Sequence, residues 1–221
     1  LESCGPEGEK LIEYVEKEWK KQPHVGELPL DIVAQVAVHG DKAVDAIDRV
    51  APKVKENQEE FLRLQNDMHC YREFAYFFIK KVHAAQHVLN YQWGKDMAEL
   101  DAAVPLLEES LVYYRRLVEL TKDTYLYANS MQTAQRRIPI GGDNGKNKTW
   151  AEMLVHYENE LTNFKANIAT LKAKAAGEFI EEDKQITAMT PAQVTLITPL
   201  KSVRLQVGAS IYRDRKSVEG K

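Results

Sequence analysis

The longest uninterrupted helical pattern in the chain runs from Asn57 to Trp93 and contains neither glycine nor proline. Its apolar side chains recur at alternating spacings of three and four residues, namely Phe61, Leu64, Met68, Tyr71, Ala75, Phe78, Val82, Ala85 and Leu89. This heptad pattern predicts one helix of about four heptads, roughly 55 Å long. Gly94 is expected to end it in the left-handed conformation. Such a helix exposes an apolar seam that other helices must cover.

A second long helix is expected after Gly94. Asp96 and Glu99 have the spacing of a capped helix start, and the pattern continues to about Gln135. Pro105 is expected either to kink this helix or to mark its true beginning. The apolar seam comprises Leu106, Tyr113, Leu117, Leu120, Thr124, Tyr127, Met131 and Ala134.

A third long helix is expected from the capping box of Thr149 and Glu152 to Gly177. Its seam again has spacings of three and four residues: Trp150, Leu154, Tyr157, Leu161, Phe164, Ile168 and Leu171. Three seams of this kind predict helices that cover one another, and short connections make successive helices antiparallel neighbours.

Shorter helices precede these three. One is expected from Glu7 to Lys21, and another begins near Pro29, whose fixed φ suits a first helical turn. The second is expected to break at Gly40, to restart with Asp41 as its cap, and to kink or end at Pro52.

The chain changes character after about residue 182. Val203, Leu205 and Val207 alternate with polar residues, which predicts two or three strands. The expected fold is therefore mainly α: an antiparallel up-down bundle of long helices over 1–182, followed by a short β segment over 183–221. That segment either pairs against the bundle or begins a further β-domain.

Composition narrows the range of functions. Hydrophobic residues make up 44% and charged residues 29% of the 221 residues, as in ordinary globular proteins. The net charge is −3, so the sequence does not predict the basic surface that a nucleic-acid-binding protein needs. No apolar run is long enough for a membrane span. Cys4 and Cys70 are interpreted as free thiols. Because the chain begins at Leu1 without a signal-peptide pattern, we expect a processed product or a piece of a longer protein.

One polar stripe is the candidate ligand surface. Tyr125, Asn129, Gln132 and Arg136 lie at helical spacing, and Trp150 follows the loop GGDNGKNK. Aromatic, amide and guanidinium groups on one face suit a polyhydroxylated ligand. The alternative is that these side chains hydrogen-bond the following loop or the β segment.

No catalytic constellation, cofactor motif or metal site is predicted. His83 and His87 have the spacing of two metal ligands, but no third ligand can be identified, and two ordinary helix histidines are the preferred interpretation. Asp67, beside the seam of the long helix, is a lone carboxylate and does not make a mechanism.

The segments EEFLRLQNDMHCYREFAYFFIKKVHAAQHVLNY and LTKDTYLYANSMQTAQRRIPI resemble the helical region of large bacterial proteins associated with polysaccharide breakdown. The resemblance covers roughly residues 5–180. It implies a secreted or periplasmic setting, a carbohydrate context and neighbouring domains of a larger protein, and it carries over no catalytic residue.

Two hypotheses follow. In the first, the chain is a non-catalytic accessory module of a carbohydrate-active protein that serves as a spacer, docking surface or glycan-contact surface. In the second, it is a protein–protein adaptor with no role in sugar binding. A metalloenzyme that uses His83 and His87 is disfavoured.

Overall fold

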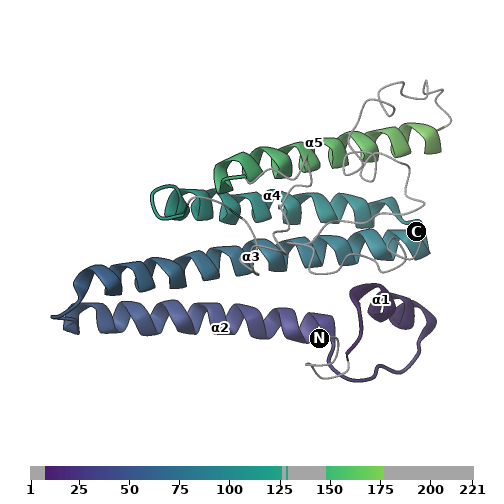
Figure 1. Ribbon diagram of the computed structural model, residues 1–221. Helices are drawn as coiled ribbons and strands as arrows, with labels where there is room; N and C mark the ends of the chain where they lie inside the picture. Colours follow the sequence, from purple (N-terminus) through teal and green to yellow (C-terminus); the bar gives the residue numbers. More distant parts are fainter. Residues whose placement is uncertain (1–7, 126–127, 129–147, 177–221) are drawn as a thin grey trace, which may run out of the picture.

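The computed structural model describes residues 8–125, 128 and 148–176 of the chain. These residues are mainly helical, as the sequence predicts (Figure 1). The elements are α1 (Leu11–Lys20), α2 (Pro29–Val50), the 3₁₀ turn η1 (Ala51–Lys53), α3 (Gln58–Gly94), α4 (Met97–Thr121) and α5 (Trp150–Ala175). The predicted β segment, 183–221, lies outside the described residues.

The helix starts follow the predicted capping chemistry. The Asp96 carboxylate accepts a hydrogen bond of 2.9 Å from the amide of Ala98, so α4 begins at Met97 and continues through Pro105. Thr149 and Glu152 bond each other's backbone amides reciprocally and form a capping box at the start of α5.

Two predictions about glycine were wrong. The helix α2 passes through Gly40 without a break, and Asp41 accepts a 2.7 Å hydrogen bond from the Tyr76 hydroxyl instead of capping a restart. At the end of α3 the left-handed residue is Lys95, with φ of 56°, and not Gly94. Gly94 instead allows a close approach, because a Cβ there would lie 3.3 Å from the indole ring of Trp19.

The helix α3 lies between two groups of helices. It packs against α2 and α1 on one side and against α4 on the other, and α5 covers α4 (Figure 1). The short connection of Lys95 and Asp96 turns the chain so that α4 returns along α3. Because α3 has helices on two sides, it needs two apolar stripes and not one.

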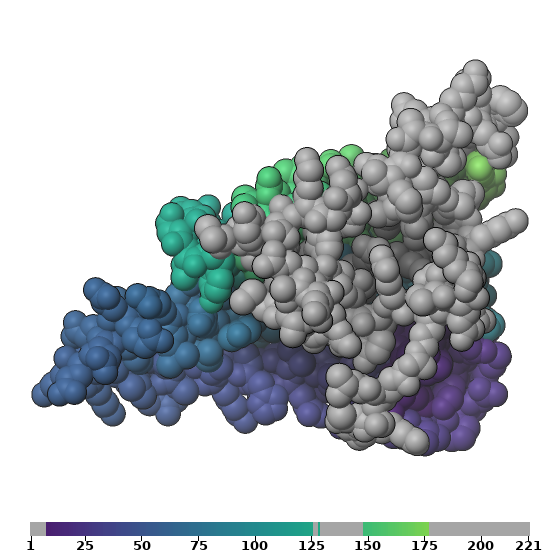
Figure 2. All heavy atoms as spheres, viewed as in Figure 1, coloured from purple at the N-terminus to yellow at the C-terminus, as the bar shows by residue number. Residues whose placement is uncertain are grey.

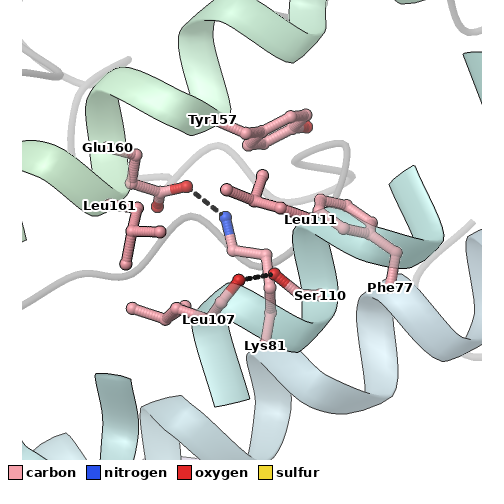
Figure 3. Close-up of a pocket in the computed structure, with 8 residues that line it drawn as sticks. All are labelled: Phe77, Lys81, Leu107, Ser110, Leu111, Tyr157, Glu160 and Leu161. Atoms are coloured by element: carbon pink, nitrogen blue, oxygen red, sulfur yellow. Dashed lines mark hydrogen bonds and ion pairs between the residues drawn. The ribbon is translucent and has the colours of Figure 1, made fainter. Parts of the chain in front are cut away.

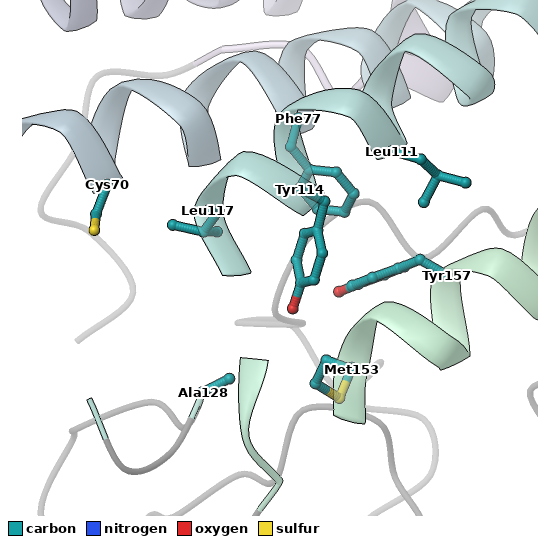
Figure 4. Close-up of a cluster of buried hydrophobic side chains, with 8 residues drawn as sticks. All are labelled: Cys70, Phe77, Leu111, Tyr114, Leu117, Ala128, Met153 and Tyr157. Carbon is teal, nitrogen blue, oxygen red and sulfur yellow. The ribbon is translucent and has the colours of Figure 1, made fainter. Parts of the chain in front are cut away.

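The larger part of the core lies between α3, α4 and α5. One cluster near the end of α4, shown in Figure 4, comprises Cys70, Phe77, Leu111, Tyr114, Leu117, Ala128, Met153 and Tyr157. A second, farther along, comprises Ala84, Val88, Tyr91, Leu100, Ala103, Leu107, Phe164 and Ile168. Phe77, Tyr114 and Tyr157 lie with their ring centroids 4.8 Å apart in each pair, in inclined geometries that favour aromatic contacts.

A smaller cluster attaches α2 to the other side of α3. It comprises the buried residues Val33, Ile79 and Val82, with Leu11 of α1 packed against it. Val82 belongs to the predicted seam, and Ala85 and Leu89 of that seam are also buried. Leu64 and Tyr71 of the same seam are 47% and 66% exposed, which contradicts the prediction of a continuous buried stripe.

Among the described residues, no helix combines the length and the apolar character that crossing a membrane requires.

Candidate ligand-binding site

Tyr125 lies just beyond the end of α4. The prediction that this helix continues to about Gln135 was wrong, because α4 ends at Thr121 and residues 122–124 form a turn. The amide of Tyr125 donates a 3.0 Å hydrogen bond to the carbonyl of Thr121. Asn129, Gln132 and Arg136, the other members of the predicted polar stripe, lie outside the described residues.

Side chains donate hydrogen bonds to two carbonyl groups near the end of α4. The Thr121 hydroxyl donates to the carbonyl of Leu117 at 2.7 Å. Asn66 of α3 donates through its Nδ2 to the carbonyl of Leu120 at 3.1 Å and to the Thr124 hydroxyl at 3.3 Å. The end of α4 is thus fastened to α3 by an amide, an arrangement typical of satisfied helix termini.

The Tyr125 side chain reaches back to α3, where its hydroxyl donates to Oδ1 of Asp67. The side chain is 40% exposed. Burial and the hydrogen bond to the Asp67 carboxylate both raise the pKa of Tyr125, so the phenol is neutral and donates. The Tyr125 hydroxyl is therefore engaged with Asp67, while part of the ring beside it is exposed.

Trp150 has a different environment. It is the first residue of α5 and is half-buried, with its ring centroid 6.0 Å from that of Phe74 and 6.3 Å from that of Tyr114. Its Nε1 is buried and has no hydrogen-bond partner among the described residues. Its ring therefore packs on the aromatic cluster, where α4 ends and α5 begins (Figure 1).

A buried ion pair crosses the core at a site that the sequence did not reveal. Nζ of Lys81 in α3 lies 2.5 Å from Oε2 of Glu160 in α5, and the side chains are 1% and 6% exposed (Figure 3). The same ammonium group lies 4.6 Å from the ring centroid of Tyr157. The one available signal was the pair of adjacent lysines inside the apolar run FFIKKVHAA.

The surroundings of this pair leave little room for a ligand. A small cavity beside it is lined by Phe77, Lys81, Leu107, Ser110, Leu111, Tyr157, Glu160 and Leu161, and has room for about one water molecule. The Ser110 hydroxyl is used within its own helix, where it donates to the carbonyl of Leu107 at 2.6 Å. The buried charges of Lys81 and Glu160 therefore neutralise each other, and their contact joins α3 to α5.

A second buried carboxylate belongs to Glu73 of α3, which is 5% exposed. Its oxygens lie 3.3 Å from Nη2 of Arg72 and 3.8 Å from Nη1 of Arg116, which is on α4. One guanidinium group of α3 and one of α4 thus lie near this buried carboxylate, whose Oε2 has no hydrogen-bond partner among the described residues. This group, too, contributes to the contact between helices.

His83 and His87 do not share a metal-binding environment with further ligands. Nδ1 of His87 lies 2.7 Å from Oε2 of Glu99, and the same carboxylate oxygen accepts a 3.3 Å bond from Asn90. Within the described part of the chain, no group of three or more His, Cys, Asp or Glu side chains is placed to hold a metal ion. The environment of His87 is that of a side chain that fastens α4 to α3.

The chain has a close relative among the solved structures. No protein-family model and no curated protein matches it. It is similar to a protein described as a GH138 enzyme targeting pectin rhamnogalacturonan II, with 73% sequence identity and a TM-score of 0.73. The match covers 81% of this chain and 21% of that chain. This chain is therefore similar to about one fifth of a larger carbohydrate-active enzyme.

Proposed function

We propose that the chain is a non-catalytic helical accessory module of a larger carbohydrate-active protein. The observation that carries this proposal is the 73% identity to a segment that makes up 21% of a polysaccharide-degrading enzyme. In this proposal residues 1–182 form an antiparallel up-down bundle, and 183–221 lead into a further β-domain. The module spaces and docks the neighbouring domains of the same protein.

The contacts of the buried charged side chains in the described core support a structural role for this module. Lys81 pairs with Glu160 across the core, and Glu73 lies between two arginines. These charged groups already contact one another inside the protein. The cavity beside Lys81 has room for about one water molecule. A rigid helical framework of this kind suits a module that sets the distance between other domains.

The proposal includes a glycan-contact surface made of Tyr125, Asn129, Gln132, Arg136 and Trp150. Tyr125 supports it, because this ring is partly exposed and its hydroxyl lies beside the Asp67 carboxylate. By analogy with the related GH138 enzyme, the polysaccharide is a pectin such as rhamnogalacturonan II. The sequence resemblance to bacterial polysaccharide-degrading proteins adds a secreted or periplasmic setting to the proposal.

The test is a chimera in which this chain replaces its counterpart in the related GH138 enzyme. We expect the chimera to fold and to release sugar from rhamnogalacturonan II at a rate within about threefold of the parent enzyme, because the exchanged segments are 73% identical in sequence. Deletion of the segment is expected to lower the melting temperature of the enzyme. The isolated chain is expected to release no sugar.

Two results would overturn the proposal. Release of reducing sugar by the isolated chain would show that it is itself an enzyme. A chimera that folds but is no more stable than the deletion variant would show that the chain does not dock to the other domains, and would favour the adaptor hypothesis.

A further inference from the structure

Lys81 places its ammonium group in the core between α3 and α5. Its side chain is 1% exposed, and Nζ lies 2.5 Å from Oε2 of Glu160. The same Nζ lies over the ring of Tyr157, 4.6 Å from the centroid, and over the ring of Phe77, 5.5 Å from the centroid. Both distances are within the roughly 6 Å at which a ring face attracts a cation. One carboxylate and two aromatic rings thus surround a single ammonium group (Figure 3).

The groups around the ammonium are also held by contacts that do not involve Lys81. Phe77 precedes Lys81 by four residues in α3, so the two side chains lie on one face of that helix. Tyr157 and Glu160 are three residues apart in α5 and likewise share a face. The two rings pack on each other, and each also packs on Tyr114, with centroids 4.8 Å apart in every pair. The aromatic cluster therefore positions both rings beside the ammonium group.

The small cavity beside Lys81 completes these surroundings. An ammonium group carries three N–H donors, and within the described part of the chain one of them donates to Glu160. The cavity has room for about one water molecule, and Ser110 lines it. The Ser110 hydroxyl gives its hydrogen to the Leu107 carbonyl, so its oxygen can accept from such a water. The site thus combines a carboxylate, two ring faces and room for one water.

We infer that Phe77, Tyr157 and Glu160 form a binding site for a primary ammonium ion, which the protein fills with its own Lys81. The faces of aromatic rings are electronegative, and a carboxylate is a strong acceptor from a charged N–H donor. A neutral molecule of the same shape lacks both attractions. A guanidinium group is larger and planar, and it does not fit where there is room for about one extra water. This inference concerns the core alone and does not rest on the proposed function.

The test is the rescue of a truncated side chain by a small ligand. Lys81→Ala removes the side chain beyond Cβ, whose atoms correspond to those of propylammonium, and buried cavities of this kind can admit small ligands. The melting temperature of the whole chain is followed by circular dichroism with propylammonium chloride at up to about 100 mM. For a dissociation constant of about 10 mM, the melting temperature of Lys81→Ala is expected to rise by about 3–6 °C. That of the parent chain is expected to stay unchanged, because Lys81 already fills the site.

Controls separate recognition of the charge from the filling of a cavity. Propanol has the same chain length without the charge, and sodium chloride matches the ionic strength, so neither is expected to raise the melting temperature of Lys81→Ala. In the same background, Glu160→Gln is expected to abolish the rescue, and Tyr157→Leu to weaken propylammonium binding about threefold to tenfold. Glu158→Gln is the matched control, because this carboxylate is on the same helix but pairs with Arg115 at the surface. It is expected to leave the rescue unchanged.

A second measurement uses the unaltered chain. In ¹⁵N NMR, the enclosed ammonium of Lys81 is expected to exchange its hydrogens slowly, to show nuclear Overhauser effects to the ring of Tyr157, and to be shifted upfield by that ring. Lys81→Arg keeps the charge but is expected to lower the melting temperature, because the guanidinium fork needs more room. If Lys81→Ala is unfolded without a ligand, the rescue is read as the return of the helical circular dichroism signal on addition of propylammonium.

Four results would overturn the inference. Equal stabilisation of Lys81→Ala by propanol would show that the site recovers only apolar volume. No response of this variant to propylammonium would show that the site does not bind the ion, and a rescue that survives Glu160→Gln would place the bound ion elsewhere. An ammonium signal of Lys81 that exchanges as fast as those of exposed lysines would show that the group is not enclosed. None of these results bears on the proposed function, which the chimera tests separately.

Discussion

The two halves of α3 share one sequence pattern but differ in burial. In the C-terminal half, Phe77, Val82 and Val88 are 0%, 6% and 2% exposed. In the N-terminal part, before Asn66, Leu62 and Leu64 are 60% and 47% exposed. A helix that is continuous in sequence and in backbone is therefore enclosed at one end and open to solvent at the other.

The positions of the neighbouring helices cause this difference. The helix α4 ends at Thr121, fastened to α3 at Asn66, and α5 begins at Trp150. Beyond that point α3 keeps α2 as its neighbour, and the two project together past the end of α4 (Figure 2). The comparison teaches that a heptad seam shows which face can be buried, while the lengths of the partner helices decide how much of it is buried.

The largest effect is expected at Lys81, in the enclosed half. Lys81→Met leaves the Glu160 carboxylate buried without its partner, which is expected to lower the free energy of unfolding by about 3–5 kcal/mol. Chemical denaturation measures this change in the free energy of unfolding. The Lys81→Met, Glu160→Leu double variant is expected to recover most of the loss, because it removes both buried charges. A double variant as unstable as the single one would contradict this account of the pair.

A matched pair of alanine substitutions tests the difference in burial directly. Phe77→Ala is expected to lower the free energy of unfolding by about 3–5 kcal/mol, because it removes a fully buried ring that contacts Tyr114 and Tyr157. Leu64→Ala is expected to lower it by less than about 1 kcal/mol. The same denaturation experiment measures both. Equal losses would show that some other surface covers the N-terminal half.

Much of the fold could be predicted from local chemistry. The start of α5 followed from Thr149 and Glu152, and the start of α4 from Asp96, because these side chains bond backbone groups close in sequence. The burial of the α3 seam was only partly predictable. Leu64 fits the seam as well as Val82 does, and its exposure depends on where α4 ends in space, whereas Tyr71 is exposed even though α4 runs beside that part of α3.

The contacts of the candidate site could likewise be predicted only in part from the sequence. Tyr125 and Asp67 were each noted in the sequence, but their hydrogen bond joins residues 58 positions apart. The Lys81–Glu160 pair spans 79 positions, and a lysine or glutamate on a helix is usually solvated. Contacts of this kind depend on which helix faces which, and no local spacing in one sequence determines that.

The boundary between the two halves is the next place to test. Asn66→Ala removes the amide that donates to the Leu120 carbonyl and the Thr124 hydroxyl, and is expected to lower the free energy of unfolding by about 1 kcal/mol. Hydrogen exchange should become faster in the last turn of α4 and stay unchanged in α5. Faster exchange throughout α4 would contradict a local fastening role.

The smallest effect is expected at α1, which packs beside the enclosed half. Nδ1 of His24 lies 2.7 Å from Glu9 and its Nε2 lies 2.6 Å from Glu18. Hydrogen bonds to Glu18 and Glu9 raise the pKa of His24 above its usual 6.5. Burial opposes ionisation of Glu9, but bonds from Lys17, His24 and the Val25 amide outweigh it and hold the pKa of Glu9 at about 2.

The direction of the pH effect follows from these two shifts. The His24 contribution is complete below pH 6.5 and is lost as the pH rises through the raised pKa of the folded state. The Glu9 contribution is complete above pH 4.5 and is lost as the pH falls toward about 2. The protection factors of the α1 amides, which correct for the intrinsic rise of the exchange rate with pH, should therefore be highest between these limits and fall in mild alkali, while those of α3 stay unchanged. His24→Gln should abolish the alkaline change, and an unaltered pH profile in that variant would show that another group loosens α1.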